Sequence, residues 1–187
     1  MSGPNPRRRR PCSGSCPTAS PCPNALTGGE LLTYWGLLRG MDAAVVRSRA
    51  IELMRILELD EAEERGVLVI EYSTGMRKKI GLATALLHAP KVLVLDEPFE
   101  AVDPVSARVL RAMLLRFVAA GGSVVISSHV MSLVEGLCDR VAVIAEGQVV
   151  ANGTLAEVRG GSTLEDVFVR LVGDRGVGEE DLLWLAT

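Results

Sequence analysis

From Leu26 onward, the hydrophobic positions recur at the three- and four-residue spacing of amphipathic helices. Thr27 is placed to cap a first helix, because the acid at the third helical position, Glu30, completes a capping box. Asp42 is placed to cap a second helix, whose apolar residues continue the same spacing. Residues 27–59 are therefore predicted to form a pair of amphipathic helices, a pattern that any small helical bundle shares.

Two aliphatic runs break this helical period and predict strands. Residues 92–95 are continuously apolar, which predicts a strand buried on both faces of a parallel sheet, and residues 123–127 predict a second strand. Asp96 and Glu97 follow the first run, and His129 follows the second. Ligands bind at the carboxyl ends of such strands, where paired acids suit a divalent metal and an attacking water.

The last third of the chain is predicted to continue as short elements. A helix is expected over residues 133–137, and a hairpin over 141–151 with its turn at Glu146-Gly147-Gln148. Thr154 begins a short helix, and residues 162–168 begin a C-terminal one. No apolar stretch reaches about 18 residues, so we expect any membrane role to be peripheral.

Length and composition favour one α/β domain with an aliphatic core. The chain has 187 residues, of which 48% are hydrophobic and only 4% aromatic. The net charge of −3 conceals an asymmetry: residues 1–24 carry four arginines and no acid, so 16 basic and 23 acidic residues, a net charge of −7, remain. A body this acidic argues against nucleic acid as a partner.

Residues 1–24 differ from the rest of the chain. They hold six prolines, the arginine run 7–10 and three cysteines, Cys12, Cys16 and Cys22. This composition is typical of a disordered tail. The alternatives are a zinc knot, which lacks a fourth ligand nearby, a weak basic anchor to acidic lipid, and a misplaced translation start.

A third pattern precedes the first strand. Tyr72-Ser73-Thr74-Gly75-Met76 leads into a helical run. The backbone N–H groups at the start of this helix favour the binding of an anion, and Gly75 permits the backbone to come close to it. An ordinary serine N-cap is the alternative for this segment taken alone.

Four motifs in this order resemble those of the ATP-binding cassette (ABC) ATPases. They are the signature motif at 72–76, the Walker B strand at 91–98, the D-loop at 99–103 and the switch histidine, His129. The family usually has Leu-Ser-Gly-Gly-Gln at the signature, so Thr74 and Met76 are departures. The resemblance covers roughly Leu26 to Val172. It implies an α/β fold, a partial P-loop NTPase domain with a parallel sheet and a helical signature subdomain, in which the P-loop strand is missing.

The resemblance also implies roles for individual residues. The signature residues would bind the γ-phosphate of ATP held by the opposite subunit, and Asp96 would hold Mg²⁺ through water. Glu97 would polarise or deprotonate the attacking water, His129 would contact the γ-phosphate, and Asp103 would bridge to the partner. The implied site residues are Ser73, Thr74, Gly75, Met76, Asp96, Glu97, Asp103 and His129.

Two other family motifs do not occur in this sequence. It has no Gly-x-x-x-x-Gly-Lys-[Ser/Thr], the phosphate-cradling Walker A motif, and its one glutamine, Gln148, lies far from the expected Q-loop position. We therefore expect a chain truncated at its N-terminus and inactive by itself. The expected organisation is a disordered tail at 1–25, a partial ATPase domain at 26–172 that divides at residue 90, and a tail with a short helix at 173–187.

The implied function is that of an ATP-binding subunit of a bacterial-type ABC exporter. Its expected partners are a membrane permease and a second ATP-binding subunit in a head-to-tail dimer, at the cytoplasmic face of the cell membrane. Two alternatives stay open: a non-hydrolytic module that lends its signature motif to a complete partner, and a decayed or mis-started gene product. In the family the P-loop strand lies between the strands at 123–127 and 141–145, so both are expected to keep unpaired edges or to slide together.

Overall fold

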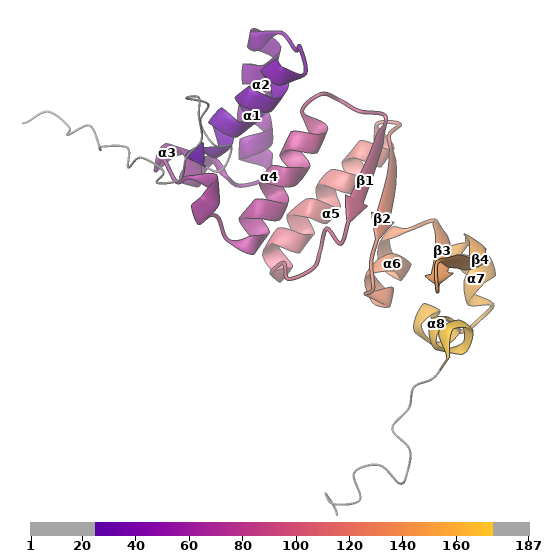
Figure 1. The fold of residues 1–187 in the computed structure, drawn as a ribbon. Helices are drawn as coiled ribbons and strands as arrows, with labels where there is room; N and C mark the ends of the chain where they lie inside the picture. The colour runs from indigo at the N-terminus through magenta and orange to yellow at the C-terminus, as the bar shows by residue number, and fades with distance from the viewer. Residues whose placement is uncertain (1–24, 174–187) are drawn as a thin grey trace, which may run out of the picture.

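The computed structural model describes residues 25–173, and the predicted tails and the three N-terminal cysteines lie outside these residues (Figure 1). The N-terminal half is helical. It contains α1 (Gly28–Leu38), α2 (Ala43–Ile56), the short α3 (Asp60–Glu64), a 3₁₀ turn at Val69–Glu71, and α4 (Thr74–Leu86).

The predicted helix starts are confirmed. Thr27 and Glu30 form the capping box of α1, and the Asp42 carboxylate accepts the first free N–H groups of α2. A third acid, Glu63 of α3, accepts the hydroxyl of Thr27 and the N–H of Gly29, both at 2.8 Å. The start of α1 is therefore held by the local sequence and by tertiary contacts with Glu63 and Leu68.

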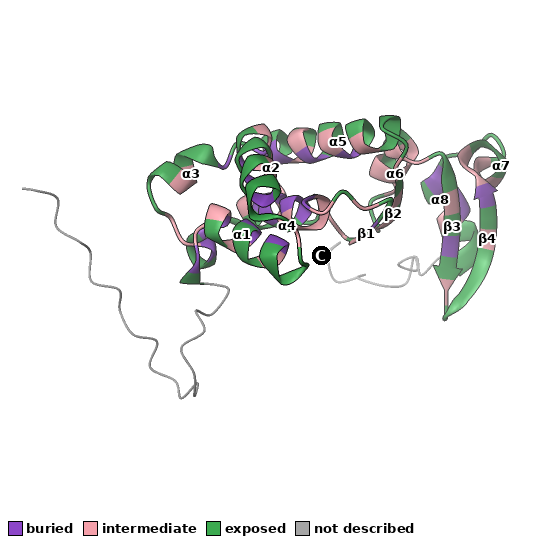
Figure 2. Ribbon diagram, turned by 90° about the horizontal axis from the view of Figure 1, so that it is seen from above, coloured by how far each residue is buried: buried purple, intermediate pink, exposed green. Residues whose placement is uncertain are grey.

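The main hydrophobic core lies between α1, α2 and α4 and extends to α5 (Pro104–Ala119) and the parallel sheet (Figure 2). Its side chains are nearly all aliphatic, as the composition predicts, with one buried tyrosine. The buried members are Leu32, Ala50, Met54, Leu57, Leu59, Val69, Tyr72, Ile80, Leu82, Ala83, Leu87, Leu93, Leu110 and Leu114.

The parallel sheet has two strands in the described part of the chain, β1 (Val92–Asp96) and β2 (Ser123–Ser127), paired along their whole lengths. The prediction that the first strand is buried on both faces is wrong. Leu93 is only 3% exposed, whereas Val94 is 76% exposed, because α4 and α5 pack on one face and no described element covers the other. The continuous apolar run therefore leaves half of its side chains in water.

The remaining elements form a smaller unit, drawn in orange and yellow in Figure 1. After α6 (Met131–Leu137), β3 (Arg140–Ala145) and β4 (Gln148–Thr154) form an antiparallel hairpin, followed by α7 (Leu155–Arg159) and α8 (Leu164–Val172). Helix α6 packs against α8, and the carboxylate of Glu135 accepts the N–H of Leu164 at 2.5 Å.

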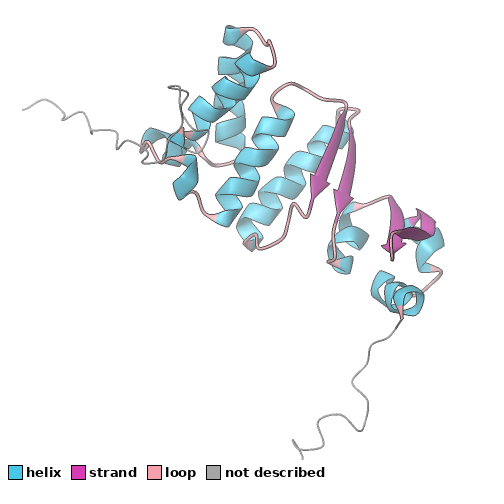
Figure 3. Cartoon of the chain, in the orientation of Figure 1, coloured by secondary structure: helices cyan, strands magenta, loops and turns pink. Residues whose placement is uncertain are grey.

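The two pairs of strands remain separate sheets, as Figure 3 shows. Within residues 25–173, β2 pairs only with β1, and β3 pairs only with β4. The expected unpaired edges are therefore present, and the alternative in which the two strands slide together is not adopted. Each open edge presents unsatisfied backbone donors and acceptors that can accept a further strand.

Candidate functional site

Polar side chains gather where β1 and β2 end. Asp96 and Ser127 are register partners across the parallel sheet. The Ser127 hydroxyl donates a hydrogen bond to the Asp96 carboxylate and accepts one from the N–H of Glu97 at 3.1 Å. A single hydroxyl therefore contacts the carboxylate of Asp96 and the backbone of Glu97, the two acids that the sequence analysis assigned to metal and water.

The second acid is paired with the histidine. Glu97 Oε1 lies 3.0 Å from His129 Nδ1, and the two side chains are 27% and 66% exposed. The hydrogen bond to Glu97 and the charge of the same carboxylate raise the pKa of His129 above its ordinary value. Glu97 and His129, two of the predicted site residues, are therefore in contact in this structure.

Glu97 has an unusual backbone conformation that is held from the signature helix. Its φ is +42°, in the left-handed region where residues other than glycine are uncommon. The Lys78 ammonium on α4 donates a hydrogen bond to the Glu97 carbonyl at 2.6 Å. Residues with such strained backbones concentrate at functional sites. Here the backbone of Glu97 is held in place by a cation from α4.

The signature segment forms the start of α4. The Ser73 hydroxyl accepts the N–H of Met76 at 3.2 Å, so Ser73 is the N-cap. Ser73 and Thr74 are exposed, Gly75 is buried, and Met76 packs partly against the core. Of the four predicted signature residues, Ser73 and Thr74 are the ones with exposed side chains, and Met76 is only partly exposed.

Asp103 caps the neighbouring helix. Its carboxylate accepts the N–H groups of Val105 and Ser106 at 3.0 and 2.9 Å at the start of α5. The hydrogen bonds from Ser106, backbone first and then side chain, lower the pKa of Asp103. Gly75 lies beside this cap, because a Cβ added at Gly75 would be 2.9 Å from the Asp103 carboxylate. The predicted signature and D-loop residues thus meet within one chain.

Sequence reasoning missed two residues of this site. Ser127 was assigned only to a strand, although its position at the strand end, two residues before His129, marked it as a group at the same sheet edge. Lys78 was read as part of a helical run. Its role depends on the packing of α4 beside β1, which no local pattern reports.

Asp96 is the side chain of this site that could hold a divalent metal ion. Among residues 25–173, no group of three or more His, Cys, Asp or Glu side chains is assembled as a metal site. Mg²⁺ commonly takes only one or two carboxylates and completes its shell with water and substrate phosphates, and the exposed Asp96 suits that mode. The pocket beside Asp96 has a volume of about 180 Å³. Typical ligand pockets have about 300–1,000 Å³, so it does not enclose a nucleotide.

Known proteins are similar to this chain in sequence and in fold. The family model described as ABC transporter matches residues 15–100. The linearmycin resistance ATP-binding protein of Bacillus subtilis is 32% identical over 77% of this chain and 47% of its own length. The daunorubicin/doxorubicin resistance ATP-binding protein of Streptomyces peucetius is 36% identical over 78% of this chain and 43% of its own.

A solved structure titled as the ATP-binding subunit of an ABC transporter superposes with a TM-score of 0.70. It is 28% identical in sequence, and the match covers 79% of this chain and 63% of that one. These matches relate the chain to the ATP-binding subunits of ABC transporters, and its fold is part of an ABC ATPase domain of the P-loop NTPase class. The chain spans about half the length of the curated relatives that it matches. None of the helices within residues 25–173 has the length and apolarity needed to cross a membrane.

Proposed function

We propose that this chain supplies the Walker B, switch and signature groups of an ABC exporter ATPase, which hydrolyses ATP at a dimer interface to energise a membrane permease. The observation that supports it best is the meeting of Asp96, Glu97 and His129 at the ends of two parallel strands. Asp96 would hold Mg²⁺ together with the phosphates of ATP. Glu97 would accept a proton from the attacking water, and His129 would contact the γ-phosphate.

The signature surface belongs to the same proposal. Ser73 and Thr74 are exposed at the positive end of α4, where backbone N–H groups favour a phosphate. The phosphate would be the γ-phosphate of ATP bound by a second ATP-binding subunit in a head-to-tail dimer, which Asp103 would help to hold. The permease would contact the helical part at the cytoplasmic face of the membrane. The exporter class is supported by two similar proteins that are named for drug resistance.

A second candidate is a non-hydrolytic module that lends its signature surface to a complete partner. It is favoured by the contrast between an exposed Ser73–Thr74 surface and the lack of a Walker A motif in the 187 residues. In this candidate Glu97 does not act on water in any state of the chain. The two functions share the signature surface and differ at Glu97.

One mixing experiment tests both functions. The chain is added to an intact homologous ATP-binding subunit, and ATP hydrolysis is measured for the mixture and for each component. Thr74→Asp places a carboxylate on the phosphate surface and is compatible with the helix start, so it is expected to abolish any stimulation while the fold is kept. Ser48→Asp, on an exposed position of α2, is the matched control.

The outcomes separate the candidates. Stimulation that is lost with Thr74→Asp and also with Glu97→Gln supports the hydrolytic function. Stimulation that is lost with Thr74→Asp and kept with Glu97→Gln supports the non-hydrolytic module. Without stimulation, or with stimulation that survives Thr74→Asp, the signature surface has no role in trans and both candidates fail.

A further inference from the structure

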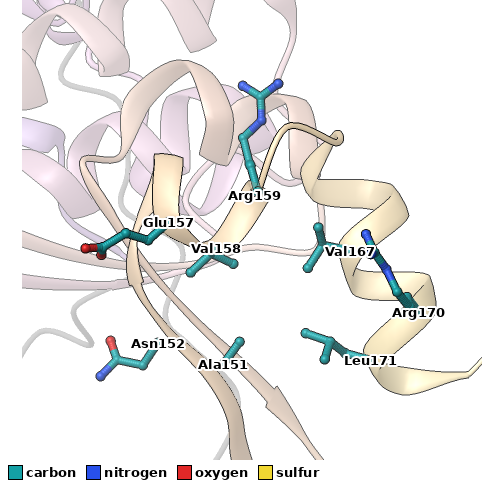
Figure 4. Close-up of a pocket in the computed structure, with 9 residues that line it drawn as sticks. Ala151, Asn152, Glu157, Val158, Arg159, Val167, Arg170 and Leu171 are labelled. Atoms are coloured by element: carbon teal, nitrogen blue, oxygen red, sulfur yellow. The ribbon is translucent and has the colours of Figure 1, made fainter.

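The C-terminal unit contains a groove that takes no part in the site described above. It lies between β4, α7 and α8 and has a volume of about 440 Å³ (Figure 4). Val158 from α7 and Val167 and Leu171 from α8 point into it, and Ala151 of β4 forms its floor. We call this space, with Arg170 at its rim, the C-terminal groove.

The groove is lined by both apolar and polar side chains, with Arg170 at one end and the acid Glu157 and the amide Asn152 at the other (Figure 4). Leu171 is 40% exposed, so the apolar wall is partly open to water. Arg170 also lines the groove, and its guanidinium makes a long contact of 3.5 Å with the Ser162 hydroxyl. Hydrogen bonds from Thr163, and then the charge of Arg170, lower the pKa of Asp166, one turn earlier on α8. The second arginine of the lining, Arg159, is instead engaged by the Ser162 carbonyl and the Glu135 carboxylate. An apolar ligand with an acidic group at the Arg170 end, away from Glu157, would complement this lining.

The sequence of the chain contains such a segment directly after the groove. Residues 179–181 are Glu-Glu-Asp, and residues 182–185 are Leu-Leu-Trp-Leu. They lie outside the described residues, which end one residue after α8, at Gly173. No other segment beyond the described part joins a run of acids to a run of large apolar side chains.

The connection is long enough for this segment to turn back. Gly173 has a φ of +97°, outside the helical region, and α8 ends before it. Nine residues from Gly173 to Leu182 span up to about 30 Å when extended. Gly176 and Gly178 within this connection permit a reversal. A tether this short also produces a high effective concentration of the segment at the groove.

We propose that residues 182–185 dock in the C-terminal groove of the same chain, with the acids 179–181 beside Arg170. Docking covers the open apolar wall at Val158 and Leu171, and it pairs the rim cation with opposite charge.

Tryptophan fluorescence tests this docking in the full chain. The sequence has two tryptophans, Trp35 and Trp184, so Trp35→Phe leaves Trp184 as the only reporter. We expect its emission to be blue-shifted relative to a free peptide of residues 174–187. We also expect its quenching constant with acrylamide to be lower by about a factor of three, since docking removes the indole from water.

Two kinds of variant identify the groove as the binding place. Leu171→Asp puts a charge in the apolar wall at a half-exposed position and is expected to return Trp184 to the peptide value. Val105→Asp, 67% exposed at the start of α5, is the matched control and is expected to change nothing. Arg170→Glu is expected to weaken docking, and Glu179→Arg with Glu180→Arg in the same chain is expected to restore it.

The result that overturns the proposal is a Trp184 signal equal to that of the free peptide, or one that Leu171→Asp leaves unchanged. If the protection of Trp184 from acrylamide disappears when the protein is diluted, the segment docks onto a second copy. This result also contradicts docking within one chain. Circular dichroism of each variant checks that the helix content of the chain is unchanged, so that a loss of Trp184 protection is not caused by general unfolding.

Discussion

Gly75 and Asp103 touch within one chain: a Cβ at Gly75 would lie 2.9 Å from the Asp103 carboxylate and 2.9 Å from the Ser106 hydroxyl. The signature glycine therefore has a packing role of its own, because it lets α4 approach the capped start of α5. Any test of the signature surface through Gly75 alters this contact first. For this reason Thr74, which is exposed, is the better position for a charge.

The first prediction concerns this contact. Gly75→Ala is expected to lower the free energy of unfolding by about 1–3 kcal/mol, since a methyl group forced into a packed contact displaces its neighbours. Gly81→Ala on the same helix is the control, because nothing lies within 4 Å of a Cβ at that position. It is expected to stabilise the chain by about 0.5–1 kcal/mol. Urea denaturation of both variants measures the difference, and equal stability of the two would contradict the packing role of Gly75.

The second prediction concerns the two histidines, which titrate on opposite sides of the ordinary value of about 6.5. Hydrogen bonding to Glu97 raises the pKa of His129. Burial, and then the charge of Arg39, lowers the pKa of His88. Protonated His129 therefore stabilises the fold below the unfolded pKa, and this contribution is lost as pH rises through the raised folded pKa.

NMR titration of the imidazole resonances measures both values in one sample. Glu97→Gln is expected to bring the pKa of His129 down toward its ordinary value and to leave that of His88 unchanged. A His129 pKa that does not respond to Glu97→Gln would show that the 3.0 Å pair does not exist in solution.

The third prediction concerns nucleotide binding by the chain alone. Without the Walker A backbone cradle and its lysine, the triphosphate charge meets few donors. Calorimetry is expected to find binding of Mg-ATP no tighter than millimolar, and hydrolysis is expected to be unmeasurable. An intact homologous subunit under the same conditions is the positive control. Micromolar affinity, or turnover that Glu97→Gln abolishes, would contradict this expectation.

The fourth prediction concerns the uncovered face of the parallel sheet. Val94→Thr is expected to change stability by less than about 0.5 kcal/mol and to reduce binding of a hydrophobic dye, because its side chain is 76% exposed. Leu93→Ala, at the next residue but 3% exposed, is expected to cost about 2–5 kcal/mol. Dye fluorescence and thermal denaturation distinguish the two faces, and similar costs for both variants would show that another element covers Val94.

The open edges of β2 and β3 lead to an expectation for hydrogen exchange. Amides of α1 and α2 are expected to exchange more slowly than those of the two small sheets, because the helices contribute most of the core and the sheets have unpaired edges. Uniform strong protection of β2 and β3, together with a sharp cooperative melt of the monomer, would show that these strands need no further partner.

The sequence by itself determined the local features of this protein. Thr27, Asp42 and Ser73 mark helix starts because a short polar side chain can accept the free N–H groups of a first turn, whatever lies beyond. The strands at 92–95 and 123–127 could be predicted from their runs of apolar residues. The acids Asp96 and Glu97 were placed at a strand end because they directly follow the first run. The order of motifs then indicated the ABC ATPase class.

Only the tertiary structure decided how these features meet. A run of aliphatic residues indicates that a strand can be buried. The elements that pack around the strand decide which of its faces are buried, and Val94 lies on the face that is exposed. In the same way, Ser127 joins Asp96 and Glu97 only because β2 pairs in parallel with β1. The contacts of Lys78 and Gly75 depend on how α4 lies beside β1 and α5. Each involves residues distant in sequence, whose proximity comes from packing rather than from any local pattern.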